Sequence, residues 1–207
     1  MAGNLDVIRT FTLSTQEHFI FGYGSLICAE SRARTGVSGE AVDATVQGIE
    51  RGWIVPVSHS QQTALGAMDN DQALCNGVVF AIDDDNLAKF DERELGYTRR
   101  LVPHDKIDSR QKLPENAKVW TYVGVESRPP NEHFPITQSY LDVIVNGCLS
   151  FGGHFLQNFV KTTSHWGHLI NDRHEPRYPR PMAGNAHHRH FDEWLAELIP
   201  HHFDRRS

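Results

Sequence analysis

The feature that most constrains the fold is the run His18–Cys28, in which an apolar segment leads directly into a turn bracketed by glycines. The first residues are β-branched and aromatic, which is typical of a buried strand. Gly22, Tyr23, Gly24 and Ser25 follow without a polar spacer, and glycines permit positive φ angles and a close approach of the backbone to a ligand. The amides of such a turn can converge, which predicts a small anion-binding site. The alternative is an ordinary glycine-rich turn after a strand.

Composition and charge limit the classes of protein to which the chain can belong. Its 207 residues fit one domain, or one domain with an elaborated tail. With 39% hydrophobic and 22% charged residues, it has the composition of a globular protein that buries a core. The net charge of −6, without a basic stripe, argues against a nucleic-acid partner. No apolar run approaches the roughly 18 residues of a membrane span, and residues 1–17 lack the apolar segment of a signal peptide.

The cysteines indicate a compartment. Cys28, Cys75 and Cys148 are widely spaced and form no CxxC pair, which favours a reducing, cytoplasmic setting. Cys28 lies close to the glycine-rich turn, so a cysteine hydrolase is one alternative. Its apolar neighbours Leu26 and Ile27 favour a buried, inert thiol instead.

The pattern of apolar residues predicts a sheet-forming first half followed by helices. Strands are expected at 18–23, 41–57, 64–68, 76–82, 97–102 and 118–125, with a break near 48–52 and a turn at 69–71. Asp83 to Asp85 are expected to supply the N-cap and negative charge of a helix that ends near Glu94, with Gly96 as its stop. Leu87 and Phe90 form its buried stripe, which Leu95 extends if the helix continues that far. Later helices are expected at 137–149, around 155–160 and at 191–199.

This order of elements predicts an α+β fold, built as a small, mixed, partly closed β-barrel with helices packed against it. Three regions are expected along the chain. Residues 1–17 form a polar arm, residues 18–135 form the core domain, and residues 136–207 form a helical extension packed on the same domain.

An acidic segment, FDERELGYTR at 90–99, is the second notable motif. Phe90 and Glu94 are four residues apart and share a helix face, so a buried Phe90 turns Glu94 inward and leaves Glu92 in solvent. Burial near a helix C-terminus disfavours the charged carboxylate and raises its pKa, which suits an acid/base catalyst. The alternative is a structural ion pair with a neighbouring arginine, Arg93, Arg99 or Arg100.

Together, GYGSL at 22–26 and FDERELGY at 90–97 resemble the γ-glutamylcyclotransferase superfamily. In that family a YGS-type loop cradles the substrate, and the glutamate of an acidic motif, roughly D-x-x-E-x-x-x-Y, is the catalytic base and acid. Asp91, Glu94 and, after a slightly shorter gap, Tyr97 match that motif. The resemblance covers roughly residues 18–125.

The resemblance implies a cofactor-independent enzyme that cyclises a small γ-glutamyl compound to 5-oxoproline and releases an amine or a peptide. It implies Glu94 as general acid/base, no metal, and substrate contacts from Tyr23, Gly24, Ser25, Leu26 and Tyr97. GYGSLI is close to the glutathione-specific ChaC-like branch, but Cys28 stands where that branch usually has tryptophan. The extension after residue 136 resembles a plant-and-bacterial branch, so the leaving group stays open, and the motifs carry no indication of an oligomeric state.

Other functions use the same residues differently. A non-catalytic binding protein would keep the anion-binding turn but would have no use for a buried carboxylate at Glu94. A metal-dependent hydrolase would draw ligands from the 13 histidines, although no HExxH motif is present. In the extension, candidates for substrate contact are Trp166, Asn171, Asp172 and Arg173, the alternative for the NDR segment being a turn with capping roles.

Overall fold

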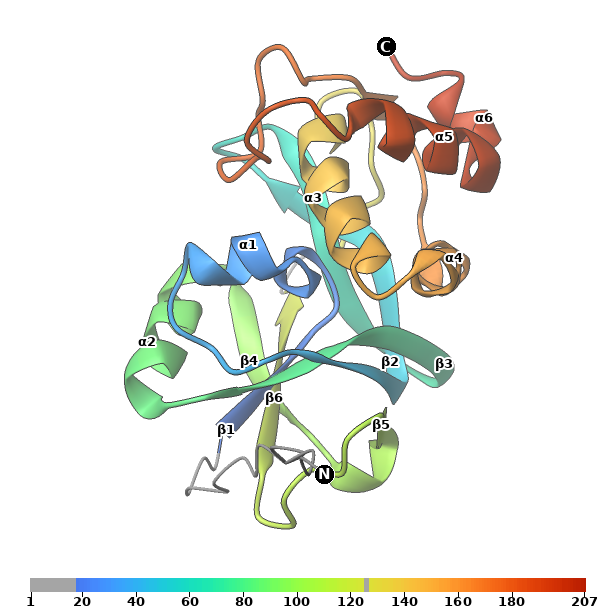
Figure 1. The fold of residues 1–207 in the computed structure, drawn as a ribbon. Helices are drawn as coiled ribbons and strands as arrows, with labels where there is room; N and C mark the ends of the chain where they lie inside the picture. The colour runs from blue at the N-terminus through green and yellow to red at the C-terminus, as the bar shows by residue number, and fades with distance from the viewer. Residues whose placement is uncertain (1–17, 125–126) are drawn as a thin grey trace, which may run out of the picture.

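A seven-stranded mixed sheet forms the centre of the fold in the computed structural model, which describes residues 18–124 and 127–207 (Figure 1). Its strands are β1 (His18–Gly22), β2 (Val42–Val57), β3 (Gln62–Ile82), β4 (Tyr97–Val102), β5 (Ile107–Ser109), β6 (Lys118–Gly124) and β8 (Thr163–Ser164). The strand order is β4-β6-β1-β3-β2-β5, with β8 beside β2. β1 pairs in parallel with β6 and antiparallel with β3. The predicted α+β class is confirmed, and the predicted arm at 1–17 lies outside the described residues.

The long β2–β3 hairpin corrects two sequence predictions. The break expected near 48–52 is only an irregularity, because β2 continues through Gly48, which has a φ of +88° at a shift in register. Likewise, 64–68 and 76–82 belong to one strand, because Asp69 and Asn70 pair with Ile49 and Gly48 where a turn was expected. Pro56 lies next to the last residue of β2.

The helix before the acidic motif forms as predicted. α2 (Asp84–Arg93) begins after Asp83, whose carboxylate accepts a hydrogen bond of 2.8 Å from the amide of Asn86. Leu87 and Phe90 lie on the inward face of this helix and are buried. Gly96, with a φ of +98°, reverses the chain into β4, a conformation that favours glycine. Leu95 falls outside the helix and is 83% exposed, so it does not extend the buried stripe.

The remaining elements follow the turn after β1 or fill the second half of the chain. They are η1 (Ser25–Ile27), α1 (Ala29–Ala33), η2 (His104–Lys106), β7 (Ile136–Thr137), α3 (Gln138–Leu149), α4 (Gly153–Lys161), β9 (Leu169–Ile170), α5 (His188–Leu198) and α6 (Pro200–Phe203). Figure 1 shows α3 to α6 gathered together beside the far part of the β2–β3 hairpin. α3 approaches η1 so closely that a Cβ on Gly147 would lie 2.6 Å from the amide nitrogen of Cys28. None of the helices in the described part of the chain has the length and apolar character that a membrane crossing requires.

Candidate active site

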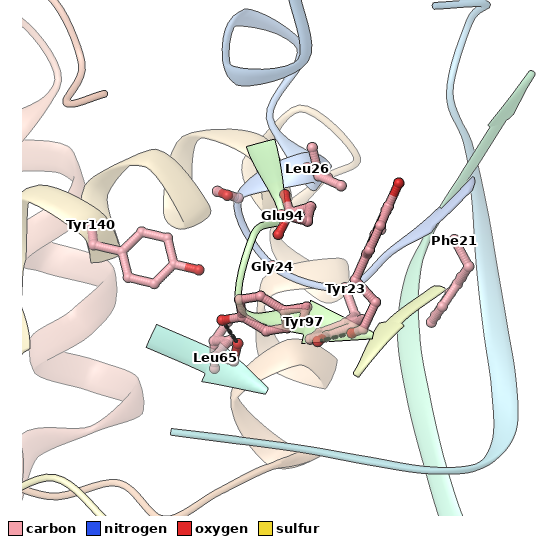
Figure 2. A pocket seen from close by; sticks show the side chains of 11 residues that line it. Phe21, Tyr23, Gly24, Leu26, Leu65, Glu94, Tyr97 and Tyr140 are labelled. Carbon is pink, nitrogen blue, oxygen red and sulfur yellow. Dashed lines mark hydrogen bonds between the residues drawn. The ribbon is translucent and has the colours of Figure 1, made fainter. Parts of the chain in front are cut away.

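A small pocket, partly open to solvent, lies where β1 ends, and it brings the two sequence motifs together. Its walls come from the turn after β1, from the junction between α2 and β4, and from β3, β6 and α3. Figure 2 shows the hydroxyl group of Tyr140 directed toward the Gly24 turn and Glu94. The lining residues are Phe21, Gly22, Tyr23, Gly24, Ser25, Leu26, Leu65, Glu94, Tyr97, Tyr122 and Tyr140. The six site residues implied by the family resemblance, Tyr23, Gly24, Ser25, Leu26, Glu94 and Tyr97, are all among them.

A side chain at either glycine of the turn would crowd a neighbouring residue, most severely at Gly22. A Cβ on Gly22 would lie 2.7 Å from the Cβ of Leu26, and one on Gly24 would lie 3.3 Å from the hydroxyl oxygen of Tyr140. Glycine permits positive φ angles, but neither residue uses this freedom, since Gly24 has a φ of −131° and Gly22 is not among the positive-φ residues. Protein atoms of Leu26 and Tyr140 approach this backbone, and the predicted approach of a ligand stays a prediction.

The turn presents amides to the pocket. The carbonyl groups of Gly24 and Ser25 accept hydrogen bonds from the amides of Ile27 and Cys28, at 2.9 and 3.2 Å. Within the described part of the chain, the amides of Gly24, Ser25 and Leu26 have no backbone acceptor. Unpaired amides at the start of a helical turn are suited to bind an anion.

Arg51 holds this turn from behind. It is fully buried, and its guanidinium donates to the carbonyl of Tyr23 at 3.2 Å and to that of Asn76 at 2.7 Å. The same guanidinium also donates hydrogen bonds to the hydroxyl groups of Thr162 and Thr163, in the segment after α4. The turn is therefore tied to β3 and to the C-terminal half of the chain.

Glu94 lines the same pocket as the turn. It is the C-cap of α2, its amide donates to the carbonyl of Phe90 at 3.0 Å, and its side chain is only 17% exposed. Glu92 is exposed, as helix geometry predicts. Burial raises the pKa of Glu94 above its ordinary value, although the positive charges of Arg93 and Arg180 act in the opposite direction.

Arg93 links the two motifs, a role that sequence reasoning missed. Its Nε lies 3.0 Å from a carboxylate oxygen of Glu94, so the ion pair weighed as an alternative is present. Its other nitrogens donate to the hydroxyl of Ser25 at 2.9 Å and to groups of Ser31 and Thr35 on and after α1. The carboxylate and the turn are thus held in a fixed relation.

The other two arginines considered as partners of Glu94 form ion pairs elsewhere. Arg99 pairs with Asp91, and Arg100 pairs with Asp69.

Tyrosines surround the carboxyl group. The hydroxyl of Tyr97 donates to the carbonyl of Leu65 at 2.8 Å, and that of Tyr23 to the carbonyl of Tyr122 at 2.5 Å. Tyr140 shares a hydrogen bond with the side chain of Ser25. Burial raises the pKa of each of these phenols, so all remain neutral hydrogen-bonding groups at neutral pH. Tyr122 and Tyr140 carried no motif signal, apart from the place of Tyr140 four residues before the buried Ile144 on one helix face.

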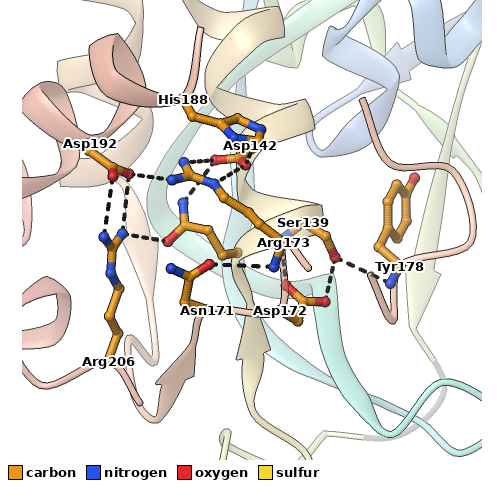
Figure 3. A network of polar contacts seen from close by, with 10 residues as sticks. Ser139, Asp142, Asn171, Asp172, Arg173, Tyr178, His188, Asp192 and Arg206 are labelled. Atoms are coloured by element: carbon orange, nitrogen blue, oxygen red, sulfur yellow. Dashed lines mark hydrogen bonds and ion pairs between the residues drawn. The ribbon is translucent and has the colours of Figure 1, made fainter. Parts of the chain in front are cut away.

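The residues proposed from the extension do not line this pocket. Trp166 packs edge-on against Trp53, with ring centroids 5.5 Å apart. Asp172 accepts a hydrogen bond of 2.7 Å from the amide of Ser139, and Arg173 binds Asp142 (Figure 3). Unpaired amides in the first turn of α3 need an acceptor, so the capping alternative for the NDR segment is the correct one.

The histidines and Cys28 lie apart from the pocket lining. Among residues 18–124 and 127–207, no three His, Cys, Asp or Glu side chains are arranged to hold a metal ion. Cys28 is buried, and its sulfur accepts a long contact of 3.6 Å from the side-chain amide of Asn146. The structure therefore brings no nucleophile–base pair involving this thiol into the pocket.

Comparisons with known proteins agree with this architecture. Two solved structures are similar in fold: a γ-glutamyl cyclotransferase (TM-score 0.56, 18% identity) and an uncharacterized protein from Homo sapiens (TM-score 0.54, 19% identity). Each match covers 70% of this chain and 85% of the other. A search of curated proteins finds no significant match. The family model described as "Gamma-glutamyl cyclotransferase, AIG2-like" matches residues 20–141, more than half of the chain. The chain therefore belongs to the γ-glutamyl cyclotransferase, AIG2-like family.

Proposed function

We propose that the protein cyclises a small γ-glutamyl compound to 5-oxoproline and releases the attached amine or peptide. The observation that carries this proposal is the pairing, in one small pocket, of a buried carboxyl group of raised pKa with a turn of unpaired amides. A pure binding protein would gain nothing from placing a carboxylate opposite an anion site. An acid/base catalyst needs a carboxyl group of this kind.

The reaction needs one group that first takes a proton and then returns it. The α-amine of the γ-glutamyl group attacks its own γ-carbonyl carbon, forming the ring C–N bond as the original amide C–N bond breaks. The α-ammonium group must lose two protons to become the ring N–H. Glu94 accepts one proton from the attacking nitrogen and delivers it to the leaving nitrogen. The second proton passes through solvent to the released amine, which leaves as an ammonium group, so protons balance over one turnover. A carboxyl group whose pKa lies nearer neutrality performs both transfers more readily than an ordinary one.

The turn supplies orientation. In this proposal the amides of Gly24, Ser25 and Leu26 hold the α-carboxylate of the substrate, which folds the flexible chain so that the amine faces the γ-carbonyl. Such preorganisation can be worth several kcal/mol. One of these amides can instead stabilise the oxyanion that develops on the carbonyl oxygen. The three free cysteines, all buried, are compatible with action in a reducing compartment such as the cytoplasm.

A panel assay tests the proposal. Purified protein is incubated with γ-glutamyl amino acids, γ-glutamyl amines and glutathione, and 5-oxoproline is measured by chromatography with mass detection. Release from at least one compound, at a rate proportional to enzyme concentration, is the expected result. Absence of 5-oxoproline from the whole panel would contradict the proposal.

The pH dependence of the rate is a further expected outcome. Glu94 must be ionised to accept the proton, so kcat/KM falls as pH drops through its raised pKa, above the range of ordinary carboxyl groups. The positive charge of Arg93 favours the ionised form of Glu94. Arg93→Met should therefore move the acidic limb of the pH profile of kcat/KM to higher pH. Arg93→Lys keeps the charge and should leave the limb close to its original place. If the acidic limb of the pH profile stayed at the same pH in Arg93→Met, ionisation of Glu94 would not be the cause of that limb.

A further inference from the structure

A segment of the extension runs along the side of the active site that carries Glu94. We call residues 172–181 the strap. At its start, the carboxylate of Asp172 accepts a hydrogen bond of 2.7 Å from the amide of Ser139 (Figure 3). It also accepts one of 2.8 Å from the amide of Arg177. At its end, Arg34 at the end of α1 donates to the carbonyl of Pro181 at 2.8 Å. The strap is therefore anchored both to α3, which carries Tyr140, and to α1, which binds Arg93.

Tyr178 joins the strap to the pocket wall. It is only 6% exposed, and its ring stacks on that of Tyr140 with centroids 4.5 Å apart. Its hydroxyl is buried and has no hydrogen-bond partner among the described residues. A buried hydroxyl without a partner is costly, which points to an acceptor outside the chain.

Arg180 is fixed between these two anchors. It follows Tyr178 by two residues, and Pro179 and Pro181 on either side restrict its backbone. Its Nε is also buried without a hydrogen-bond partner in the part of the chain that the structure describes. Its charge lies close enough to Glu94 to lower the pKa of that carboxyl group. The strap thus holds two buried donors without a partner among the described residues, the hydroxyl of Tyr178 next to Tyr140 and the Nε of Arg180, whose charge acts on Glu94.

The substrate itself indicates which group these donors meet. Under the proposed function, the turn amides take the α-carboxylate, and the leaving nitrogen lies within reach of Glu94. When the leaving group is an α-amino acid, its own carboxylate is two bonds from that nitrogen. A cation next to Glu94 is placed to bind this carboxylate, whereas a simple γ-glutamyl amine offers it no acceptor.

We propose that Arg180 is a specificity-determining residue that binds a carboxylate on the leaving group and so selects γ-glutamyl amino acids over γ-glutamyl amines. This inference rests on the proposed function. It concerns a residue outside the matched family region, which ends at residue 141.

The test compares one substrate pair across four proteins: wild type, Arg180→Gln, Arg180→Lys and Arg177→Gln. The pair is a γ-glutamyl amino acid and the same compound with its leaving-group carboxylate converted to a carboxamide. Wild type should prefer the carboxylate, and Arg180→Gln should lower kcat/KM for it on the order of 10- to 100-fold while changing the carboxamide little. Arg180→Lys should recover part of the preference. Arg177→Gln is the matched control, because Arg177 is an exposed arginine of the same strap, and it should behave as wild type.

The outcomes separate the two levels of the proposal. If Arg180→Gln lowered kcat/KM equally for both substrates, the specificity role would be overturned. Such a result would indicate that Arg180 acts on Glu94 or on binding of the substrate α-carboxylate. Equal turnover of both substrates by wild type would overturn it without any variant, even if Arg180→Gln failed to fold. In both cases 5-oxoproline still forms and the proposed function stands. No 5-oxoproline from any substrate would overturn both.

Discussion

Glu94→Gln is expected to lower kcat by about 10²- to 10⁴-fold, the range typical of losing a general acid/base. Glutamine has nearly the same shape and can still accept a hydrogen bond from Arg93, but it cannot take up or return the proton. The measurement is steady-state release of 5-oxoproline, with circular dichroism to establish that the variant is folded. A fully active Glu94→Gln would remove this residue from the mechanism.

The stability of this variant also has an expected sign. Burial raises the pKa of Glu94 above its value of 4.5 in the unfolded chain, so the folded state binds this proton more tightly. Stability is therefore lost as pH rises between the unfolded and folded pKa values. Glu94→Gln removes that loss, and its Tm at pH 8 should be equal to or higher than that of wild type.

Glu92→Gln is the matched control for this prediction. Glu92 is an exposed carboxylate two residues away on the same helix, so its amide variant should keep activity within about twofold of wild type. If Glu92→Gln were inactive while Glu94→Gln was active, the catalytic role would pass to Glu92.

The second large effect is expected at the turn. In Gly22→Ala the new methyl group would lie 2.7 Å from the Cβ of Leu26, closer than such atoms approach, so the turn must shift. Moving the turn amides by even about 1 Å from their working positions can cost roughly 10²-fold, so we expect kcat/KM to fall by about that factor. The same crowding should lower the free energy of unfolding by about 1–3 kcal/mol. Kinetics and urea titration measure the two effects.

Gly39→Ala is the control for the turn. Its Cβ would approach that of Ala81 at 3.3 Å, a contact that small shifts relieve, and Gly39 does not line the pocket. Activity should be unchanged. A Gly22→Ala enzyme with the kcat and KM of wild type would mean that the turn plays no part in positioning the substrate.

The local parts of the fold were predictable because their signals lie within a few residues. Four nearby residues determine α2 almost alone: Asp83 at the N-cap, Leu87 and Phe90 on the buried face, and Gly96 after the end of the helix. The β2–β3 hairpin was not, because Gly48 and the polar residues 69–71 resemble breaks when each strand is considered separately. Only pairing across the hairpin carries both strands through these positions.

The candidate site divides in the same way. The inward direction of Glu94 follows from its spacing to Phe90, and the amide-lined turn follows from two closely spaced glycines. Arg93 as a bridge, Tyr140 as a wall and Arg180 beside the carboxyl group depend on which distant segments meet. No local sequence pattern indicates which distant segments meet, since arginine and tyrosine also occur on solvent-exposed surfaces.

The central claim is that the substrate's own amine, rather than water, attacks the γ-carbonyl while Glu94 moves the proton. The most direct test is product analysis after turnover in ¹⁸O-labelled water. Cyclisation gives 5-oxoproline without ¹⁸O, in a one-to-one ratio with the released amine. Free glutamate carrying ¹⁸O in its γ-carboxylate would show hydrolysis instead and would contradict the account.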